Sequence, residues 1–135
     1  CALPILAEAY ERGWHNVGDT QTWVRLGVES SCVRWGVSAS DAAAYAATVN
    51  VSSMNDIAME IWVDMFLQGY EAWTQWRRHD FPVLSPPVAA ITGTGVPVRN
   101  GYSQLVASQN KASYDAAVAA QGPNTQDTKL WWDTK

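Results

Sequence analysis

Residues 69–84 read GYEAWTQWRRHDFPVL, and this stretch predicts the C-terminal end of an amphipathic helix. Trp73 and Arg77 stand four positions apart, a spacing at which a helix brings the guanidinium over the indole ring. Cations in the last turn are favourable because they oppose the partial negative charge of a helix C-terminus. Pro82 ends the helix, since proline disfavours a helical conformation of the residue before it.

Two further charges in this stretch have structural interpretations. Glu71 and Arg78 lie seven positions apart, on nearly the same side of the helix two turns on. Arg77 has a planar guanidinium, which predicts an ion pair with a carboxylate of another helix. Because neither feature needs a ligand, we interpret the stretch as scaffold and expect no catalytic role for it.

The helical pattern continues upstream, so residues 54–80 are predicted to form one long core helix that begins at Ser52 or Ser53. Its apolar side chains recur every three or four positions throughout. They are Ala58, Trp62, Met65, Phe66, Gly69, Trp73 and Trp76.

Asp56, Glu60 and Asp64 fall four positions apart on another face of the same helix. Paired carboxylates can hydrolyse a glycosidic bond, but that chemistry needs two groups that face each other across a cleft. A ladder along one helix is more often a solvated face or a partner for basic side chains. We therefore interpret the ladder as structural, and a glycosidase hypothesis rests on it alone.

Two helices are predicted near the start of the chain, and they form an antiparallel hairpin. The first covers residues 4–14 and ends near Gly13. Ile5, Leu6, Ala9 and Tyr10 lie on one face of this helix, and Glu8, Glu11 and Arg12 lie on the other. The second begins at Thr20 or Thr22 and runs to about Trp35, with Trp23, Leu26, Val28 and Val33 as its apolar residues and Gly36 at its end.

The remaining segments complete an all-α prediction. A short helix over 41–49 follows Ser40, and a later one covers roughly 104–120. Residues 82–101 are rich in Pro, Gly, Val and Thr, which is typical of a long surface loop. The C-terminal tail is irregular. Since no stretch alternates apolar and polar residues over the length of a strand, we expect helical hairpins only.

Composition excludes several classes of protein. The chain of 135 residues is long enough for one domain with a modest core. It is 47% hydrophobic and 16% charged, which excludes a disordered tail. The net charge of −4 and the scattered Lys and Arg residues argue against nucleic acid as a partner. No apolar run approaches the roughly 20 residues that cross a bilayer.

The eight tryptophans are an unusually large number for a chain of this length. An indole ring packs well in a core and also stacks well on a sugar ring. Core packing is the commoner use, so we expect it for most of the tryptophans and keep sugar stacking as the alternative.

The sequence offers few groups for catalysis. Its two histidines are His15, in a turn, and His79, at a helix end, and neither has a Cys or His neighbour at metal-ligand spacing. The motifs G-x-S-x-G and H-E-x-x-H and a phosphate-binding glycine loop are missing from the sequence. We therefore predict no metal site, no cofactor and no catalytic residue.

The two cysteines, Cys1 and Cys32, are too few for a disulfide framework, and a bridge between them stays open. The polar tether typical of an acylated cysteine does not follow Cys1, because residues 2–7 run straight into a helix. We interpret Cys1 as an internal residue exposed by truncation. The uncapped start of the first helix likewise predicts that residues 1–135 are a single C-terminal portion of a larger helical domain whose N-terminal part is absent.

Four stretches carry a family resemblance, and they occur in the expected order: AEAYERGW (7–14), GYEAWTQWRRHDFPVL (69–84), NKASYDAAVAAQG (110–122) and TKLWWD (128–133). Together they resemble the C-terminal region of SusD/RagB-type outer-membrane nutrient-binding lipoproteins of the SusD-like branch. That branch has an E-A-W-x-x-x-R-R-x-x-x-P helix end and a K-x-W-W-D finish. The matching residues are Glu71, Ala72, Trp73, Arg77, Arg78 and Pro82, then Lys129, Trp131, Trp132 and Asp133.

The resemblance spans nearly the whole chain and has three departures. Before the last helix such proteins usually have a basic residue, then Tyr-Pro and an acid ahead of an Asn. Here Arg99, Tyr102 and Asn110 fit, but Ser103 replaces the Pro and Val106 replaces the Glu. Pro4 also interrupts an opening that is ordinarily continuous and apolar.

The resemblance implies a helical scaffold with tetratricopeptide-like hairpins in a cell-surface lipoprotein of Bacteroidota-type Gram-negative bacteria, anchored to the outer membrane by a lipidated Cys outside this segment. It implies binding of an oligosaccharide or peptide, delivery to a SusC-type TonB-dependent transporter, and no enzymatic activity. The family's ligand-stacking aromatics lie largely upstream of the matching region, so the ligand-binding residues are unknown. The matched Glu71, Trp73, Arg77, Arg78, Trp131 and Trp132 are expected to be structural.

A different class of function remains as the alternative. Helical hairpins with Trp-rich apolar faces are also typical of helical-repeat modules that bind a polypeptide in a groove. Co-purification with a transporter barrel or with a soluble complex distinguishes the two hypotheses.

Overall fold

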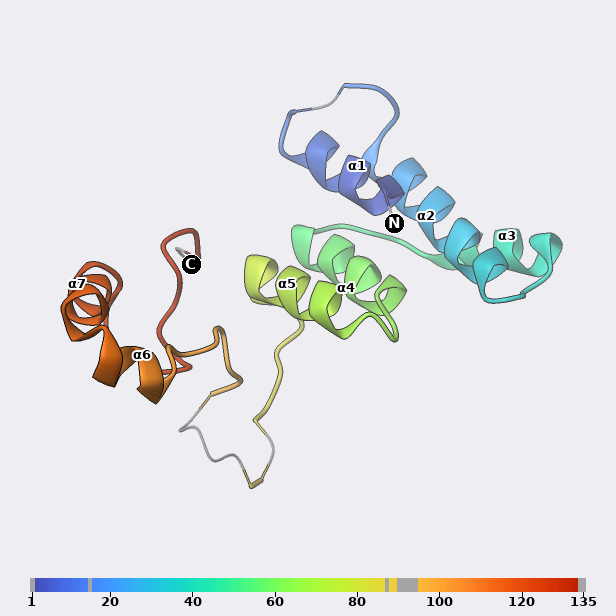
Figure 1. Ribbon diagram of the computed structural model, residues 1–135. Helices are drawn as coiled ribbons and strands as arrows, with labels where there is room; N and C mark the ends of the chain where they lie inside the picture. The colour runs from blue at the N-terminus through green and yellow to red at the C-terminus, as the bar shows by residue number, and fades with distance from the viewer. Residues whose placement is uncertain (1, 15, 87, 90–94, 134–135) are drawn as a thin grey trace. The chain divides into compact units, whose positions relative to one another are not determined.

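The computed structural model describes residues 2–14, 16–86, 88–89 and 95–133. The chain divides into two compact units, Cys1–Pro82 and Val83–Lys135. The first unit contains α1 (Ala2–Glu11), α2 (Thr20–Arg34), α3 (Ala39–Thr48), α4 (Met54–Asp64) and α5 (Gly69–His79). The second contains α6 (Gln104–Gln109) and α7 (Lys111–Gln121) (Figure 1). Over the described residues every regular element is a helix, which confirms the all-α prediction.

The predicted hairpin of the first two helices is confirmed, because α1 and α2 lie side by side (Figure 1). Gly27 allows them to approach closely. A Cβ atom added at Gly27 would stand 2.8 Å from Cγ of Pro4, closer than non-bonded carbon atoms approach. Pro4 itself lies in the first turn of α1, where the missing N–H costs no helical hydrogen bond.

The residues that α1 buries most deeply are not those of its apolar face. The buried residues of α1 are Pro4, Ala7 and Glu8, whereas Ile5 is 44% exposed. Glu8 is only 1% exposed, although the sequence places it on the charged face of the helix. The acidic side chain is buried because cationic groups surround its carboxylate. The hydrophobic pattern of α1 alone cannot reveal a cation that comes from another helix.

The helix starts confirm one predicted cap and correct two. Ser53 caps α4, and a capping box with Asp56 completes the start. The cap of α2 is Asp19, whose carboxylate accepts a hydrogen bond from the Thr22 N–H; the expected cap, Thr20 or Thr22, lies inside the helix. The cap of α3 is Ser38, two residues before the predicted Ser40.

The single long helix predicted over 54–80 is wrong. It is divided into α4 and α5, which pack against each other as a second hairpin (Figure 1). The turn between them contains Leu67 in the left-handed region, with a φ of 64°. A spacing of three and four continues through this turn, so periodicity alone could not reveal the break.

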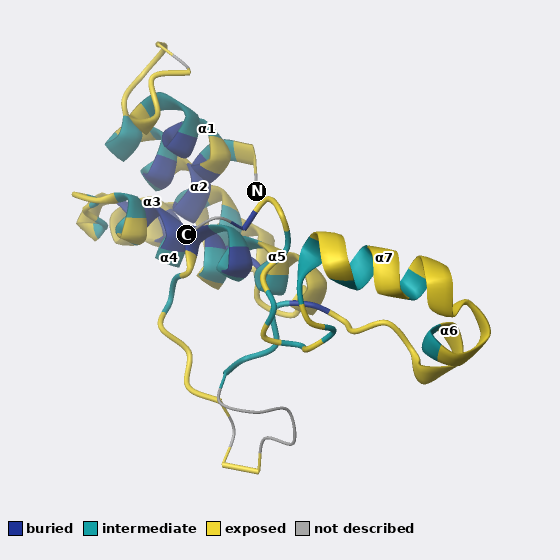
Figure 2. Ribbon diagram, turned by 90° about the vertical axis from the view of Figure 1, so that its left-hand side faces the viewer, coloured by how far each residue is buried: buried dark blue, intermediate teal, exposed yellow. Residues whose placement is uncertain are grey.

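The core of the first unit lies between α1, α2, α3 and α4 (Figure 2). Its buried apolar residues are Ala7, Val24, Val28, Ala46, Ile57, Ile61 and Met65. Gln21 of α2 adds polar links to the connection between α3 and α4. Its side chain donates to the Val49 carbonyl (2.8 Å) and accepts from the Val51 N–H (3.0 Å).

In the second unit the helix predicted over roughly 104–120 is interrupted at Asn110, which separates α6 from α7. Ser103, which stands in place of the family's proline, caps α6 by accepting from the Val106 N–H. The Asn124 side chain holds the tail to Tyr102, because it accepts from the Tyr102 N–H (2.8 Å) and donates to the Tyr102 carbonyl (3.0 Å).

The described parts of the segment 82–101 contain no helix or strand, which agrees with the predicted loop. Residues 87 and 90–94 of that loop lie outside the described residues, and so do Cys1 and His15. Cys32 is a free cysteine, and the question of a bridge to Cys1, which the sequence left open, falls on a residue outside the described ones.

Candidate functional site

The C-terminal half of α5 is joined to α1 by a buried ionic cluster around Glu8. Oε1 of Glu8 accepts from Arg78 and, at 2.7 Å, from Nε of Arg12. Nε2 of His79 lies 3.5 Å from the other oxygen, Oε2. Glu8 and His79 are both buried, while the two arginines reach partly into solvent. The cluster joins α1 to α5 through a carboxylate that is buried from solvent.

The stacking predicted between Trp73 and Arg77 is present, with the guanidinium carbon of Arg77 3.7 Å from the indole centroid. Arg77 is buried. The neighbouring Arg78 binds Glu8 of α1, and the pairing of Arg77 with a carboxylate of another helix stays a prediction. Trp76 donates its indole N–H to the Pro82 carbonyl (3.0 Å), which fixes the chain just after α5.

The other residues of the family motifs lie in different settings. Glu71 is exposed in the first turn of α5. In the second unit Trp131 is 84% exposed and Trp132 is 38% exposed. Lys129 pairs with the buried carboxylate of Asp133 at 3.3 Å. Glu71, Trp73, Arg77 and Arg78 belong to the first unit, and Trp131 and Trp132 belong to the second.

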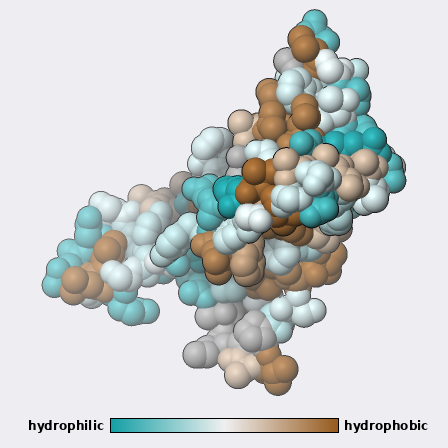
Figure 3. All heavy atoms as spheres, turned by 90° about the vertical axis from the view of Figure 1, so that its right-hand side faces the viewer, coloured by the Kyte–Doolittle hydropathy of each residue, from teal (hydrophilic) through white to brown (hydrophobic). Residues whose placement is uncertain are grey.

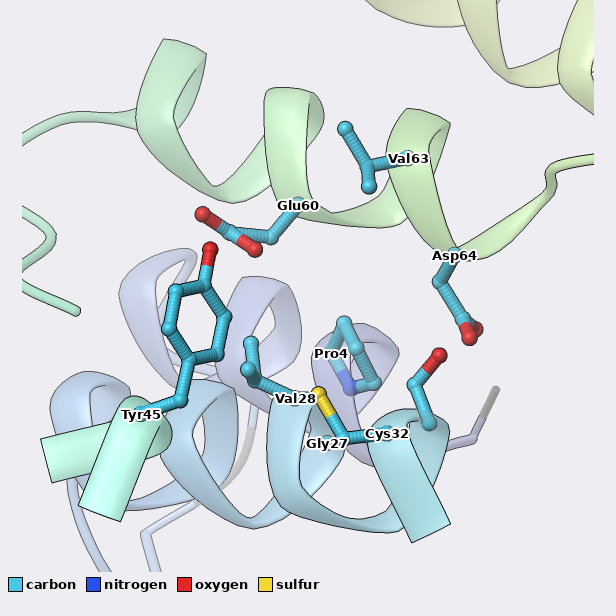
Figure 4. A pocket seen from close by; sticks show the side chains of 9 residues that line it. Pro4, Gly27, Val28, Cys32, Tyr45, Glu60, Val63 and Asp64 are labelled. Atoms are coloured by element: carbon cyan, nitrogen blue, oxygen red, sulfur yellow. The ribbon is translucent and has the colours of Figure 1, made fainter. Parts of the chain in front are cut away.

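A small pocket lies between α1, α2, α3 and α4 in the first unit (Figure 4). Its volume is about 80 Å³, and its lining residues are Pro4, Gly27, Val28, Ser31, Cys32, Tyr45, Glu60, Val63 and Asp64. Tyr45 and Glu60 point toward one another at one end, and Asp64 lies at the other (Figure 4). A neighbouring groove of about 290 Å³ shares Pro4, Gly27, Ser31 and Asp64 with it and adds Arg34.

The acidic ladder on α4 has three different structural roles. Asp56 completes the capping box, and hydrogen bonds from Ser52 and Ser53 lower the pKa of its carboxyl. Asp64 is buried against Arg34, with Oδ1 of Asp64 2.9 Å from Nη2 of the arginine. The ladder is thus structural at both ends, as predicted.

Glu60, the middle residue of the ladder, lines the pocket together with Asp64. Partial burial, and to a smaller extent the charge of Asp56, raise the pKa of its carboxyl above the ordinary value of 4.5. A raised pKa is typical of a general acid, but it also follows from desolvation alone. The two carboxyl groups in the pocket, Glu60 and Asp64, both come from α4 and do not face each other across a cleft.

No group of three or more His, Cys, Asp or Glu side chains in the described part of the chain is arranged to hold a metal ion. Within the same residues, no helix combines the length and the apolar character needed to cross a membrane.

The hairpin of α4 and α5 also forms a surface that sequence reasoning missed. An apolar groove of about 400 Å³ is lined by Trp62, Val63, Met65, Phe66, Leu67, Gly69 and Ala72, and we call it the α4–α5 groove. Phe66 and Leu67 are 64% and 77% exposed. We missed the groove because a continuous helix over 54–80 would have no turn there. Hydrophobic residues form patches on the surface of the molecule (Figure 3).

Comparison with known proteins identifies the family. Residues 3–103 match the model of a SusD-like family described as starch-binding and associating with the outer membrane. A comparison with curated proteins gave no match.

Solved structures with the same fold include a chitin-binding protein, at 27% identity and a TM-score of 0.84, and a Bacteroidetes SusD-like protein, at 26% and 0.83. A third, at 23% identity and a TM-score of 0.78, is a chitin-binding SusD homologue from Flavobacterium johnsoniae. Each similarity covers 99% of this chain but only 32%, 29% and 35% of the other chain, respectively.

The chain thus spans about a third of the length of the solved structures it matches. The family match covers 101 of its 135 residues, counted from 3 to 103, and includes the α1–α5 region with the Glu8 cluster and the α4–α5 groove. The chain belongs to the SusD-like family of starch-binding proteins that associate with the outer membrane.

Proposed function

We propose that the chain is the C-terminal scaffold part of a longer, non-enzymatic cell-surface lipoprotein. That protein captures a glycan, or in some cases a peptide, and passes it to a SusC-type TonB-dependent transporter in the outer membrane of a Bacteroidota-type bacterium. Its lipid anchor is a residue outside these 135 positions, and its N-terminal remainder supplies the ligand-binding residues.

The observation that carries this proposal is the family match over residues 3–103, whose description names starch binding. The similar protein at 27% identity is described as chitin-binding, so chito-oligosaccharides are the second class of ligand to test. The interior of the first unit supports a scaffold role, because its Trp and Arg side chains hold α5 in place.

The geometry of the carboxylates supports a function in binding rather than hydrolysis. The Asp64 carboxylate is paired with Arg34, and the Asp56 carboxylate accepts hydrogen bonds in the capping box at the start of α4. Glu60 remains as one carboxyl group of raised pKa without an opposing partner in the pocket. Canonical glycoside hydrolysis requires two carboxyl groups on opposite sides of the bond.

Isothermal titration of the longer protein tests the proposal directly. Malto-oligosaccharides, chito-oligosaccharides and peptides are titrated separately, and each ligand is recovered afterwards and analysed by chromatography. The proposal predicts saturable binding of at least one glycan class and recovery of that glycan uncleaved. Cleavage of the ligand, or binding of none of the three classes, contradicts it.

A helical-repeat module that binds another protein is the second candidate, and the α4–α5 groove favours it. Affinity purification of the longer protein from outer membranes separates the candidates. A transporter barrel as the main co-purified protein supports glycan delivery, whereas a soluble complex without a barrel supports the second candidate.

A further inference from the structure

The α4–α5 groove is apolar along its whole lining. Its residues contribute an indole, a phenyl ring, a thioether and aliphatic groups, and none of them carries a charge. Trp35 extends this surface, because its ring meets the Phe66 ring edge-on with centroids 5.9 Å apart. Trp35 is itself half exposed. Contiguous apolar surface of this kind marks an interaction site rather than an ordinary solvated face.

Leu67, in the turn between α4 and α5, has an unfavourable backbone conformation. Leu67 adopts a φ of 64°, a region that residues with a Cβ atom rarely occupy. Its side chain is nevertheless directed into solvent and is 77% exposed. The left-handed residue ends the turn that follows α4, as is common at helix C-termini, and it leaves the aliphatic group of Leu67 open to water.

The apolar lining of the groove indicates which class of partner can bind there. A sugar needs hydrogen-bond partners for its several hydroxyl groups, and the side chains that line the groove offer one strong donor for this purpose, the indole N–H of Trp62, although its ring could also stack on a sugar. An apolar stripe of a helix needs no such partners and fits a groove of apolar side chains. The groove is therefore better suited to a polypeptide than to the glycan of the proposed function.

We propose that the α4–α5 groove is the surface on which an amphipathic helix from the rest of the longer polypeptide packs, with Phe66 and Leu67 as the central contacts. This inference rests on the part of the proposed function that makes residues 1–135 a portion of a longer protein. The similar solved chains are about three times as long as this one, so a helix of the same polypeptide is an available occupant.

Thiol labelling of the longer protein tests the inference. Phe66→Cys and Leu67→Cys are made separately in a background with Cys1→Ser and Cys32→Ala, and the rate of maleimide labelling is compared with the rate of the same variant in concentrated guanidinium chloride. Ala47→Cys, at an exposed position on α3, is the matched control. We expect both groove thiols to react at least tenfold more slowly in the folded protein than in denaturant, and the control thiol to react at a similar rate in both.

A photo-cross-linker placed at Leu67 then identifies the occupant. We expect an intramolecular cross-link to a segment outside residues 1–135, mapped by mass spectrometry. A cross-link to a second copy, a cross-link within residues 83–135, or unprotected groove thiols overturns the inference. Protection that appears only when the transporter or a chito-oligosaccharide is added overturns it as well.

The inference and the proposed function fail separately. Titration of the same unlabelled protein with oligosaccharides reports the proposed function. Protected groove thiols in a protein that binds no glycan leave the inference standing and contradict the proposed function. Glycan binding by a protein with fully reactive groove thiols supports the proposed function and contradicts the inference.

Discussion

The carboxylate of Glu8 in α1 accepts a hydrogen bond from the guanidinium of Arg78 in α5, seventy residues later in the chain. The two residues come from separate motifs of the family resemblance, AEAYERGW and GYEAWTQWRRHDFPVL. Their contact gives a physical reason for both motifs, since each supplies one half of a buried ion pair. It also explains how an acidic residue is tolerated in the interior of the first unit.

Replacing Glu8 with Gln should lower the free energy of unfolding by about 3 kcal/mol, because the partly buried guanidinium groups of Arg12 and Arg78 lose the buried charge that they pair with. Chemical denaturation of the purified chain measures the change. Glu11→Gln is the control, since Glu11 is an exposed acid of the same helix and should change stability by less than about 1 kcal/mol. Equal effects of the two substitutions would show that the Glu8 cluster is not a stabilising contact.

Gly27→Ala should destabilise the first unit by about 1–3 kcal/mol, because the new methyl group would overlap with the ring of Pro4 and push α1 away from α2. Gly69→Ala is the matched control. Gly69 lies in α5, and a Cβ there has no neighbouring atom within 4 Å, so alanine should be neutral or slightly stabilising. A Gly27→Ala protein as stable as the Gly69→Ala protein contradicts the close helix approach.

Glu60→Gln should raise the free energy of unfolding at pH 7 by less than about 1 kcal/mol, since the side chain is partly solvated. The folded-state pKa of Glu60 is raised above 4.5, so the folded protein binds this proton more tightly than the unfolded chain does. Stability then falls as the pH rises from 4.5 through the folded-state pKa. The advantage of the amide should therefore vanish below pH 4.5, as urea denaturation at several pH values will show.

Asp56→Asn provides the contrast of opposite sign. Hydrogen bonds from Ser52 and Ser53 lower the pKa of Asp56 below 3.8, so its ionised form stabilises the fold above that pH. The substitution should lower stability at pH 7, and the loss should shrink as the pH falls below 3.8 through the folded-state pKa. The same pH trend for both variants would contradict the assigned environments.

Leu67→Gly in the 135-residue chain should raise the free energy of unfolding by about 0.5–1 kcal/mol. Glycine removes the cost of a left-handed conformation at this residue, and the greater freedom of the unfolded chain cancels part of the gain. Differential scanning calorimetry of the two proteins measures the change. A loss of stability would mean that the Leu67 side chain is already packed in the chain by itself.

Local sequence patterns predicted the helices themselves better than they predicted which helices pack against each other. The all-α class, the first hairpin, the Ser53 cap and the contact of Trp73 with Arg77 all depend on residues near each other in the chain, and each is confirmed. The α4–α5 hairpin was missed, because the apolar spacing continues through the turn at Leu67 as it would through a helix.

Less of the candidate site could be predicted from the sequence. The burial of Glu8 depends on Arg78, which no pattern within a single helix connects to it. The family motif singled out Arg77 and Arg78 together, and only the fold distinguishes the arginine that stacks on Trp73 from the one that binds Glu8. The α4–α5 groove could not be predicted, since it exists only where the two helices turn back on each other.

We propose that the indole and guanidinium groups of α5 support the fold while the cargo binds in another part of the protein. Titration of a bound oligosaccharide into the Trp73→Ala variant of the longer protein, below its melting temperature, tests it most directly. We predict a dissociation constant within about threefold of the parent protein, a difference of about 0.6 kcal/mol, together with a lower melting temperature. A dissociation constant weakened tenfold or more at an unchanged melting temperature would place the ligand on this indole ring and contradict the account.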